Sequence, residues 1–570
     1  MTLLDWGVLG ASLVFIVSWG VARSRHQADM KSYLMAGRAT PWWVVALSIM
    51  ATQASAITFL STPGQAYADG MRFVQFYFGL PIAMVVLSIT AVPIYHRLNV
   101  YTAYEYLEKR FDVRVRGLTA GLFLLQRGLA CGLTIYAPAL VLSVLLGWPV
   151  SVTTALTGTL VVVYVAAGGT KAVNATQVQQ LLIILLGMGT AFVLLLRLLP
   201  DGVGVLGAVR VAGRLGRLNA VDLTFDPSSR YNLWSGLIGG FFLALSYFGT
   251  DQSQVQRYLS GASVAQSRLG LLANGLVKVP MQFVILFLGA MVFAFYQFVL
   301  PPVFFNPVET KRIAAGPRAG ELAGLEARHR QAFEERREKA VAYVAAARGS
   351  DAAAREAAGA ALEAADARFG AVRADVSRLV KETRPGADGR DANYVFLRFV
   401  LEVLPPGVVG LVLAAVFAAS MSSTAAELNA LSTTTVVDVY LRLVKKDGLD
   451  AHYVRAGRLV TVFWGLFAVA FAQYASRLGT LIEAVNVLGS LFYGTILGVF
   501  LVAFYLKKVG SMAALAGAVA GEATVLAVFA LADVGFLWLN AIGCAVVVLV
   551  ALAATAVGSG RAAAGMETST

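Results

Sequence analysis

The sequence predicts an all-α polytopic membrane protein with about 13 transmembrane helices, and three observations support this. The 570-residue chain is 58% hydrophobic and 14% charged, with a mean hydropathy of +0.71, whereas soluble domains carry about 25% charged residues. Thirteen stretches are apolar over the length of about 20 residues that a membrane helix needs. Outside residues 306–391, the few charges lie mostly in short connections.

The expected spans follow one another with short connections except after the eighth. They are roughly residues 5–23, 42–62, 73–95, 117–146, 149–167, 176–199, 232–256, 269–300, 407–436, 456–474, 480–506, 511–532 and 535–557. The first follows Asp5 and is interpreted as a retained span, not as a cleaved signal peptide.

The placement of basic residues predicts the orientation. With the N-terminus outside, the inner connections and tail hold 20 Lys and Arg, and the short outer connections hold 7. Positive charge favours the cytoplasmic side, so the N-terminus is expected outside and the C-terminus inside. The net charge of +13 therefore reflects topology and does not indicate a nucleic-acid partner. Cys131 and Cys544 lie in apolar runs, which argues against a disulfide framework.

One apolar stretch, residues 408–431, combines a membrane helix with a cluster of hydroxyls. It reads VVGLVLAAVFAASMSSTAAELNAL and contains Ser420, Ser422, Ser423 and Thr424 among alanines. Hard cations prefer oxygen ligands, so the cluster suits an alkali-ion site. Small residues also let membrane helices pack closely, and the stretch alone is compatible with both interpretations.

Two other spans are interrupted by polar residues. The second contains Thr52, Gln53, Ser55 and Thr58 near its middle, and the seventh contains Gly249-Thr250-Asp251-Gln252. Polar groups at membrane depth usually face a protein-lined cavity. Interrupted helices at corresponding places in two repeats are typical of transporters with a midplane binding site. The offset of five spans predicts two five-helix halves, the second inverted.

Residues 306–393 form a charged insert. Its Ala/Glu/Arg-rich composition predicts two helices, about 318–348 and 351–382, broken at Gly349-Ser350-Asp351 and packed as an antiparallel hairpin outside the membrane. The expected apolar seam consists of Leu322, Leu325, Phe333, Val341 and Val344. The insert could recruit an extracytoplasmic partner, guard the substrate entrance or act as a solvated spacer, and the sequence leaves this open.

Four motifs carry a family resemblance. They are AAGGTKAVNATQVQQ at 166–180, YFGTDQSQVQRYLSGAS at 247–263, GLLANGLVKVP at 270–280 and FAASMSSTAAELNALSTTTVVDVY at 417–440. In this order and spacing they resemble the sodium/solute symporter family of glucose, proline, sialic acid, iodide and vitamin carriers. The resemblance implies a LeuT-type fold with ten core helices, spans two to eleven, in two inverted repeats that work by alternating access.

The resemblance also implies a domain organisation. The expected units are 1–41, a peripheral first helix and cytoplasmic loop; 42–305, core helices one to seven; 306–393, the hairpin insert; 394–508, core helices eight to ten; and 509–570, peripheral C-terminal helices with a short tail.

The family's sodium site implies ligands in two of these helices. The matching positions are the backbone carbonyls of Ala51, Ala54 and Ala419 and the hydroxyls of Ser422 and Ser423. Where the family commonly has an aspartate that contributes to a second cation site, this chain has Gln177, and alanines stand at 425 and 426. We therefore expect one coupling sodium ion.

The substrate site is expected along the interrupted helices and their neighbours. Carried over by position, the candidates are Gln53, Thr58, Gln75 or Tyr77, Asp251, Lys278 and Asn486. Asp251 and Lys278 are alternatively a structural ion pair. Arg127 and Glu427 also lie within apolar spans, and helix packing or snorkelling is the expected role for both.

These observations predict a multi-pass transporter of the cell membrane. Its function would be sodium-coupled symport of a small polar organic solute: a sugar, sugar derivative, carboxylate or vitamin. A proton-coupled carrier of the same fold and a transporter-like sensor are the alternatives. An enzyme is not expected, because neither metal-ligand spacing nor a nucleophile–base pair is evident.

Overall fold

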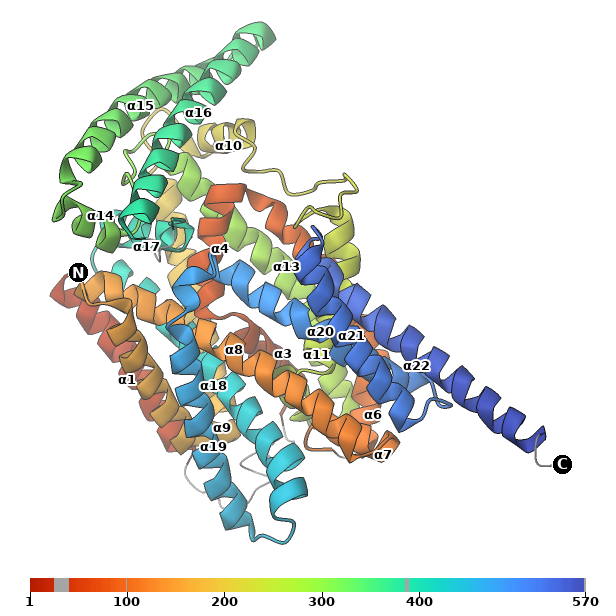
Figure 1. Ribbon diagram of the computed structural model, residues 1–570. Coiled ribbons are helices and arrows are strands. Elements are labelled where there is room, and N and C mark those ends of the chain that lie inside the picture. The colour runs from red at the N-terminus through yellow and green to blue at the C-terminus, as the bar shows by residue number, and fades with distance from the viewer. Residues whose placement is uncertain (25–39, 99, 385–388, 568–570) are drawn as a thin grey trace.

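The computed structural model describes residues 1–24, 40–98, 100–384 and 389–567, and this part of the chain is built from helices (Figure 1). Most helices form one tilted bundle, and a pair of long helices projects from one end of it (Figure 1). The expected fold class, an all-α polytopic membrane protein, is confirmed.

The helices follow in three groups. The first comprises α1 (Leu3–Ser24), α3 (Trp42–Gln53), α4 (Ala56–Asp69), the 3₁₀ segment η2 (Met71–Tyr77), α5 (Leu80–Ile89), α6 (Ala91–Leu98), α7 (Tyr104–Arg110), α8 (Val113–Leu146), α9 (Val150–Arg197) and α10 (Gly204–Arg214). The second comprises the π segment η3 (Ser235–Gly239), α11 (Gly240–Gly249), α12 (Gln252–Leu259), α13 (Val264–Phe295), α14 (Pro307–Ala314), α15 (Ala319–Ala346) and α16 (Ala352–Thr383). The third comprises α17 (Ala392–Val403), α18 (Val408–Thr434), the π segment η4 (Thr435–Val444), α19 (Asp450–Ala472), η5 (Ala475–Arg477), α20 (Leu481–Tyr505), α21 (Ser511–Leu531) and α22 (Phe536–Glu567).

Among the described residues, nine helices are long and apolar enough to cross a membrane, and the bent pair α3–α4 makes ten. Three expected spans coincide with shorter apolar helices, at Leu3–Ile16, Val150–Val163 and Ser235–Gly249. The spans expected at 149–167 and 176–199 both fall within α9, whose side chains at 167–175 are outside the described residues. A total of thirteen spans stays a prediction.

Both expected interruptions are present. The helix ends at Gln53, resumes at Ala56 and bends by 60° between α3 and α4. The other break, at Thr250 and Asp251, separates α11 from α12, and the Asp251 carboxylate accepts the Ser253 N–H as the N-cap of α12. At each break, backbone groups lose their helical partners and need others.

Glycines allow the backbone of α4 to lie in close contact with the backbones of its neighbouring helices. A Cβ placed on Gly64 would meet the carbonyl oxygen of Ala392 in α17 at 1.8 Å, and one on Gly289 of α13 would meet that of Pro63 at 2.2 Å. Because neither position admits a side chain, α4, the second half of the broken helix, is held between α13 and α17.

The insert forms α14, α15 and α16, and α15 packs against α16 as an antiparallel hairpin (Figure 1). Asp351 caps α16 by accepting the N–H groups of Ala353 and Ala354, which explains the break before Ala352. Four expected seam residues are buried, but Val341 is 50% exposed, so its placement in the seam was wrong. Ala340 and Tyr343 are buried instead, because the contact surface rotates around α15.

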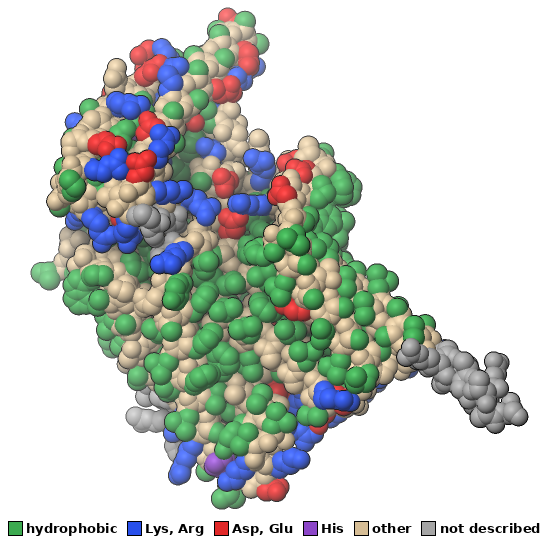
Figure 2. Space-filling model, viewed as in Figure 1, with side chains coloured by type: hydrophobic (Ala, Val, Ile, Leu, Met, Phe, Trp, Pro, Cys, Tyr) green, Lys and Arg blue, Asp and Glu red, His purple; other side chains and the backbone are tan. Residues whose placement is uncertain are grey.

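Hydrophobic side chains cover the middle of the molecular face, whereas charges gather over the hairpin and along the opposite edge (Figure 2). The helix α1 begins on the hairpin side (Figure 1). There, Asp5 accepts the N–H groups of Gly407 and Gly410 at 2.7 and 3.2 Å. A buried carboxylate thus satisfies the N-terminus of α18 and fixes α1 to the bundle.

Candidate ion and substrate site

The break after α3 lies against the hydroxyl cluster of α18. The Ser422 hydroxyl donates to the carbonyl oxygen of Ala51 at 3.1 Å, although 371 positions separate the two residues. Carbonyls in the last turn of a helix lack intrahelical partners, so this oxygen is available to another group. The two sequence-separated parts of the expected sodium site therefore meet.

The remaining expected ligands are buried in the same region. Ala54, Ala419 and Ser423 are at most 1% exposed. Within the described part of the chain, the Ser423 hydroxyl has no hydrogen-bond partner. A buried hydroxyl without a partner is costly, and a cation held by this oxygen would remove that cost. The donor set, carbonyl and hydroxyl oxygens, suits a hard monovalent cation.

Gln177 lies beside this region and cross-links two helices. Its Nε2 donates to the Thr52 hydroxyl at 2.9 Å, and its Oε1 accepts the Ser48 hydroxyl. Both ends of the carboxamide are thus bonded to α3. This residue, expected as the departure from a second cation site, connects α9 to the helix that carries Ala51.

A central cavity of about 100 Å³ opens beside the two breaks. Its walls come from α3, α4, η2, α5, α8, α11, α18 and α20. Four expected substrate residues line it: Gln53, Thr58, Tyr77 and Asn486. The mixture of aromatic and polar walls is typical of a small-molecule site.

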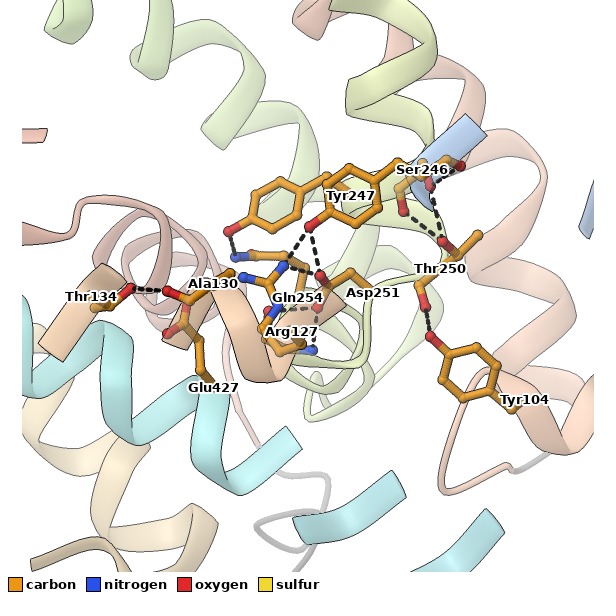
Figure 3. A network of polar contacts seen from close by, with 12 residues as sticks. Tyr104, Arg127, Ala130, Thr134, Ser246, Tyr247, Thr250, Asp251, Gln254 and Glu427 are labelled. Carbon is orange, nitrogen blue, oxygen red and sulfur yellow. Dashed lines mark hydrogen bonds and ion pairs between the residues drawn. The ribbon is translucent and has the colours of Figure 1, made fainter. Parts of the chain in front are cut away.

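Asp251 instead belongs to a buried network behind the cavity (Figure 3). Its carboxylate pairs with Arg127 and accepts the Tyr493 hydroxyl at 2.8 Å and the Ser253 hydroxyl at 2.7 Å. The alternative pairing with Lys278 was therefore wrong. Arg127 on α8 points one Nη atom at Asp251 and the other at Glu427, whereas the Lys278 ammonium has no hydrogen-bond partner in the described residues.

Lys278 and Gln75 lie away from the cavity lining. Lys278 is fully buried, its ammonium is 5.6 Å from the centre of the Tyr77 ring, and it makes no hydrogen bond within the described part of the chain. Gln75 donates to the carbonyls of Arg72 and Tyr231 and accepts the Asp222 N–H. Its side chain therefore connects η2 to the loop that precedes η3.

Arg127 and Glu427 do line the cavity, beside Tyr247 and Tyr493. The Arg127 Nη1 is 3.0 Å from the Glu427 Oε1, and the guanidinium lies 5.5 Å from the centre of the Tyr247 ring. The expected helix-packing role is present, since Arg127 on α8 joins α18 to Asp251. Sequence reasoning expects helix packing or snorkelling for both residues and misses their place at the cavity, although a charge within each apolar span is a signal that could have found it.

Comparison with known proteins places this geometry in a family. The profile of the Sodium:solute symporter family matches residues 33–323 and 376–521. The chain belongs to the sodium:solute symporter family. A sodium/sialic acid symporter of Aliivibrio fischeri is 26% identical over 560 residues, covering 96% of this chain and 92% of that protein. A human sodium-coupled monocarboxylate transporter is 27% identical over 527 residues, covering 91% and 72%.

A solved structure gives the same fold. A Na⁺-coupled sialic acid symporter, described in its substrate-bound outward-open state, superposes with a TM-score of 0.75 at 21% sequence identity, covering 98% of both chains. As a member of this family, the protein is a secondary active transporter that couples sodium to a small polar organic solute. It is a transporter rather than an enzyme, and sodium coupling displaces the proton-coupled and sensor alternatives.

Proposed function

We propose that one sodium ion binds where α18 meets the break between α3 and α4. Its ligands are the carbonyls of Ala51, Ala54 and Ala419 and the hydroxyls of Ser422 and Ser423. The observation that carries this proposal is the Ser422–Ala51 hydrogen bond beside the unpartnered, buried Ser423 hydroxyl. One ion is proposed because both ends of the Gln177 carboxamide are already bonded, and Ala425 and Ala426 offer no side-chain oxygen.

The ion would act by holding two halves of the fold together. Sodium bridges the broken helix to α18, and the same broken helix supplies Gln53 and Thr58 to the cavity. Ion binding thus fixes the cavity wall, and sodium and solute each raise the other's affinity. When α3 and α18 separate during alternating access, both sites lose ligands. A membrane potential adds about 2.3 kcal/mol to the driving force for sodium entry, per elementary charge and for each 100 mV.

The solute proposed is a carboxylate. Among the residues that line the central cavity, Arg127 supplies the positive charge, and its Nε–H is buried without a hydrogen-bond partner in the described residues. Asp251 and Glu427 already pair with its two Nη atoms, so the Nε–H is the donor left for one charge-assisted hydrogen bond to a solute carboxylate. The relatives named for sialic acid and monocarboxylates support the same class. The Tyr493 hydroxyl is already bonded to Asp251 and Arg127, so Gln53, Thr58 and Asn486 remain for the solute's polar groups.

The proposed membrane topology places the N-terminus and the hairpin outside the cell membrane and the C-terminus inside. The excess of basic residues in the other set of connections supports this orientation. The proposed units are the core, residues 42–305 and 394–508, the hairpin insert 306–393, and the peripheral segments 1–41 and 509–570.

The sodium site is tested with the Ser423→Ala variant. Uptake of labelled sialic acid and of lactate into proteoliposomes is measured against sodium concentration, using whichever acid the wild-type protein transports. The half-saturating sodium concentration should rise about tenfold or more, as loss of a hydrogen bond or ligand to a charged group predicts. Ser420→Ala is the matched control, because this hydroxyl on the same helix donates to the Thr134 carbonyl at 3.4 Å. An unchanged sodium dependence in Ser423→Ala would remove the site.

A further inference from the structure

A groove on the surface of the molecule runs between α9 and α19, and we call it the α9–α19 groove. It measures about 750 Å³, and its lining is distinct from that of the central cavity. A Cβ placed on Gly158 of α9 would clash with Val469, and one on Gly465 of α19 would clash with Val162. Small residues let membrane helices approach closely. The two helices therefore touch at these glycines, and the larger side chains on either side form the walls of the groove.

The lining of the α9–α19 groove is apolar apart from Thr159 and Arg458. The Thr159 hydroxyl donates to the Ala155 carbonyl at 2.8 Å, so its hydrogen is already used. Two lining residues, Val163 and Leu466, are 64% and 65% exposed. Because α19 is long and apolar enough to cross a membrane, such exposed side chains face hydrocarbon and not water. The groove therefore suits an occupant that is apolar along most of its length.

Arg458 supplies a positive charge at one end of the groove. Its side chain is exposed, and within the described part of the chain it makes neither a hydrogen bond nor an ion pair. Residues 459–476, which follow it, carry no charge, so Arg458 marks the level at which α19 enters the hydrocarbon. This end of the molecule lies opposite the hairpin, because α18 starts beside Asp5 on the hairpin side and the chain returns from the far end as α19 (Figure 1).

The length of the groove matches one leaflet of a bilayer. Arg458 and Val469 are eleven positions apart on α19, which corresponds to about 16 Å along the helix. Half of a hydrocarbon core is about 15 Å thick. A molecule that places a charged group at Arg458 and an apolar chain along the groove therefore has the dimensions of a phospholipid. Guanidinium groups bind phosphates strongly, and basic residues at a membrane surface attract anionic lipids in particular.

We propose that the α9–α19 groove binds one anionic phospholipid of the cytoplasmic leaflet. Its phosphate is bound by the Arg458 guanidinium, and one acyl chain lies along the groove towards Ala155 and Val469. The leaflet follows from the proposed topology, in which the end of the molecule opposite the hairpin faces the cytoplasm. The charge and the apolar lining of the groove, on which lipid binding depends, do not rest on that orientation.

The position of the groove gives the lipid an effect on the transporter core. Both α9 and α19 pack against α18, the helix that carries Ser422 and Ser423. A lipid that contacts both walls of the groove holds α9 and α19 together next to α18. Because such a lipid binds the folded protein and not the unfolded chain, it raises the stability of this part of the core.

The test is native mass spectrometry of the full-length protein, titrated with dioleoylphosphatidylglycerol or with zwitterionic dioleoylphosphatidylcholine. We expect one phosphatidylglycerol to bind saturably, and phosphatidylcholine to bind at least about fivefold more weakly, since one basic residue near the surface contributes about 1 kcal/mol. Arg458→Gln should reduce phosphatidylglycerol binding to the level of phosphatidylcholine. Thr159→Phe, which fills the groove, should weaken both lipids by about tenfold or more, because several buried CH₂ groups of the acyl chain lose their site.

Lys508→Gln is the matched control, because this exposed basic residue follows α20 and lies outside the groove. It should leave the affinity for phosphatidylglycerol unchanged. Equal unfolding temperatures in lipid-free detergent show that the variants are folded, and Arg458→Gln decides the question even if Thr159→Phe is not. Equal affinities for the two lipids, an unchanged affinity in Arg458→Gln, or an equal loss in Lys508→Gln would each overturn the proposal. None of these results bears on the sodium site, since the variants leave Ser422 and Ser423 in place.

Discussion

The hairpin and the membrane core use charge in different ways. On the hairpin, the pairs Arg328–Asp375 and Arg368–Glu335 join side chains that are between 30% and 59% exposed. In the core, Arg127 and its partners Asp251 and Glu427 are between 0% and 8% exposed. Exposed pairs contribute about 0–1 kcal/mol, whereas breaking a buried pair costs about 3–5 kcal/mol because a charge is left without a partner. The few charged pairs of the core therefore contribute more to the free energy of unfolding than the many exposed pairs of the hairpin do.

The largest expected effect in this comparison comes from Arg127→Gln. Removing the guanidinium leaves Asp251 and Glu427 without a counter-charge, so the free energy of unfolding should fall by about 3–5 kcal/mol. Sodium-dependent uptake should be lost, because the proposed carboxylate contact disappears too. Thermal unfolding and proteoliposome uptake measure the two effects. The double variant Arg127→Gln/Asp251→Asn should recover part of the stability but no uptake, and wild-type stability of Arg127→Gln would contradict the core role assigned to this pair.

The sequence predicts features that depend on nearby residues, but it does not predict contacts between residues that are far apart in the chain. Local patterns are sufficient for the breaks at residues 54–55 and 250–251 and for the hairpin helices, because polar residues at membrane depth and the Gly349-Ser350-Asp351 turn act within a few positions. The partner of Asp251 is not available locally: Arg127 is 124 residues away, and the packing of α8 against α18 and α20 brings it to Asp251 instead of Lys278. Likewise, Val341 fits a helical repeat, but the angle at which α15 meets its neighbours places Tyr343 inside instead.

The stability of the hairpin should depend on pH, because the hairpin holds a buried histidine as well as exposed ion pairs. Burial, followed by the nearby Arg373, Arg336 and Arg330, lowers the pKa of His329 from 6.5 to about 4. The folded hairpin therefore binds fewer protons than the unfolded chain between these values. The contribution of neutral His329 to the free energy of unfolding is fully present above about pH 6.5. It is lost as the pH falls towards 4, by about 3 kcal/mol in total.

Hydrogen exchange of α15 and α16 amides at pH 7.5 and pH 4.5, corrected for the intrinsic exchange rate, measures this loss. The His329→Gln variant removes the titrating group and should show a smaller difference between the two pH values. Equal protection of wild-type amides at both values would contradict the assignment.

A smaller effect is expected when charge is added to the core next to the sodium site. In Gln177→Glu, the carboxylate can still accept the Ser48 and Thr52 hydroxyls, and its charge attracts the ion by about 1 kcal/mol. The half-saturating sodium concentration for uptake should therefore fall about fivefold. Gln177→Leu is the uncharged comparison and should give no gain, because it only removes two hydrogen bonds. A higher sodium requirement in Gln177→Glu would show that the carboxamide itself is needed.

The smallest effect is expected from Arg368→Ala on the hairpin. Arg368 pairs with Glu335, but the two side chains are 55% and 43% exposed, so the free energy of unfolding should change by less than about 1 kcal/mol. Arg336→Ala, on the same hairpin, should cost more, because its guanidinium is buried on Phe369 and donates to the Tyr296 carbonyl at 2.7 Å. Thermal unfolding of the two variants side by side measures the difference. If both variants lose the same free energy of unfolding, burial does not decide how much a charged residue contributes to the stability of this protein. The large effect expected for Arg127→Gln, which rests on burial, would then have no support.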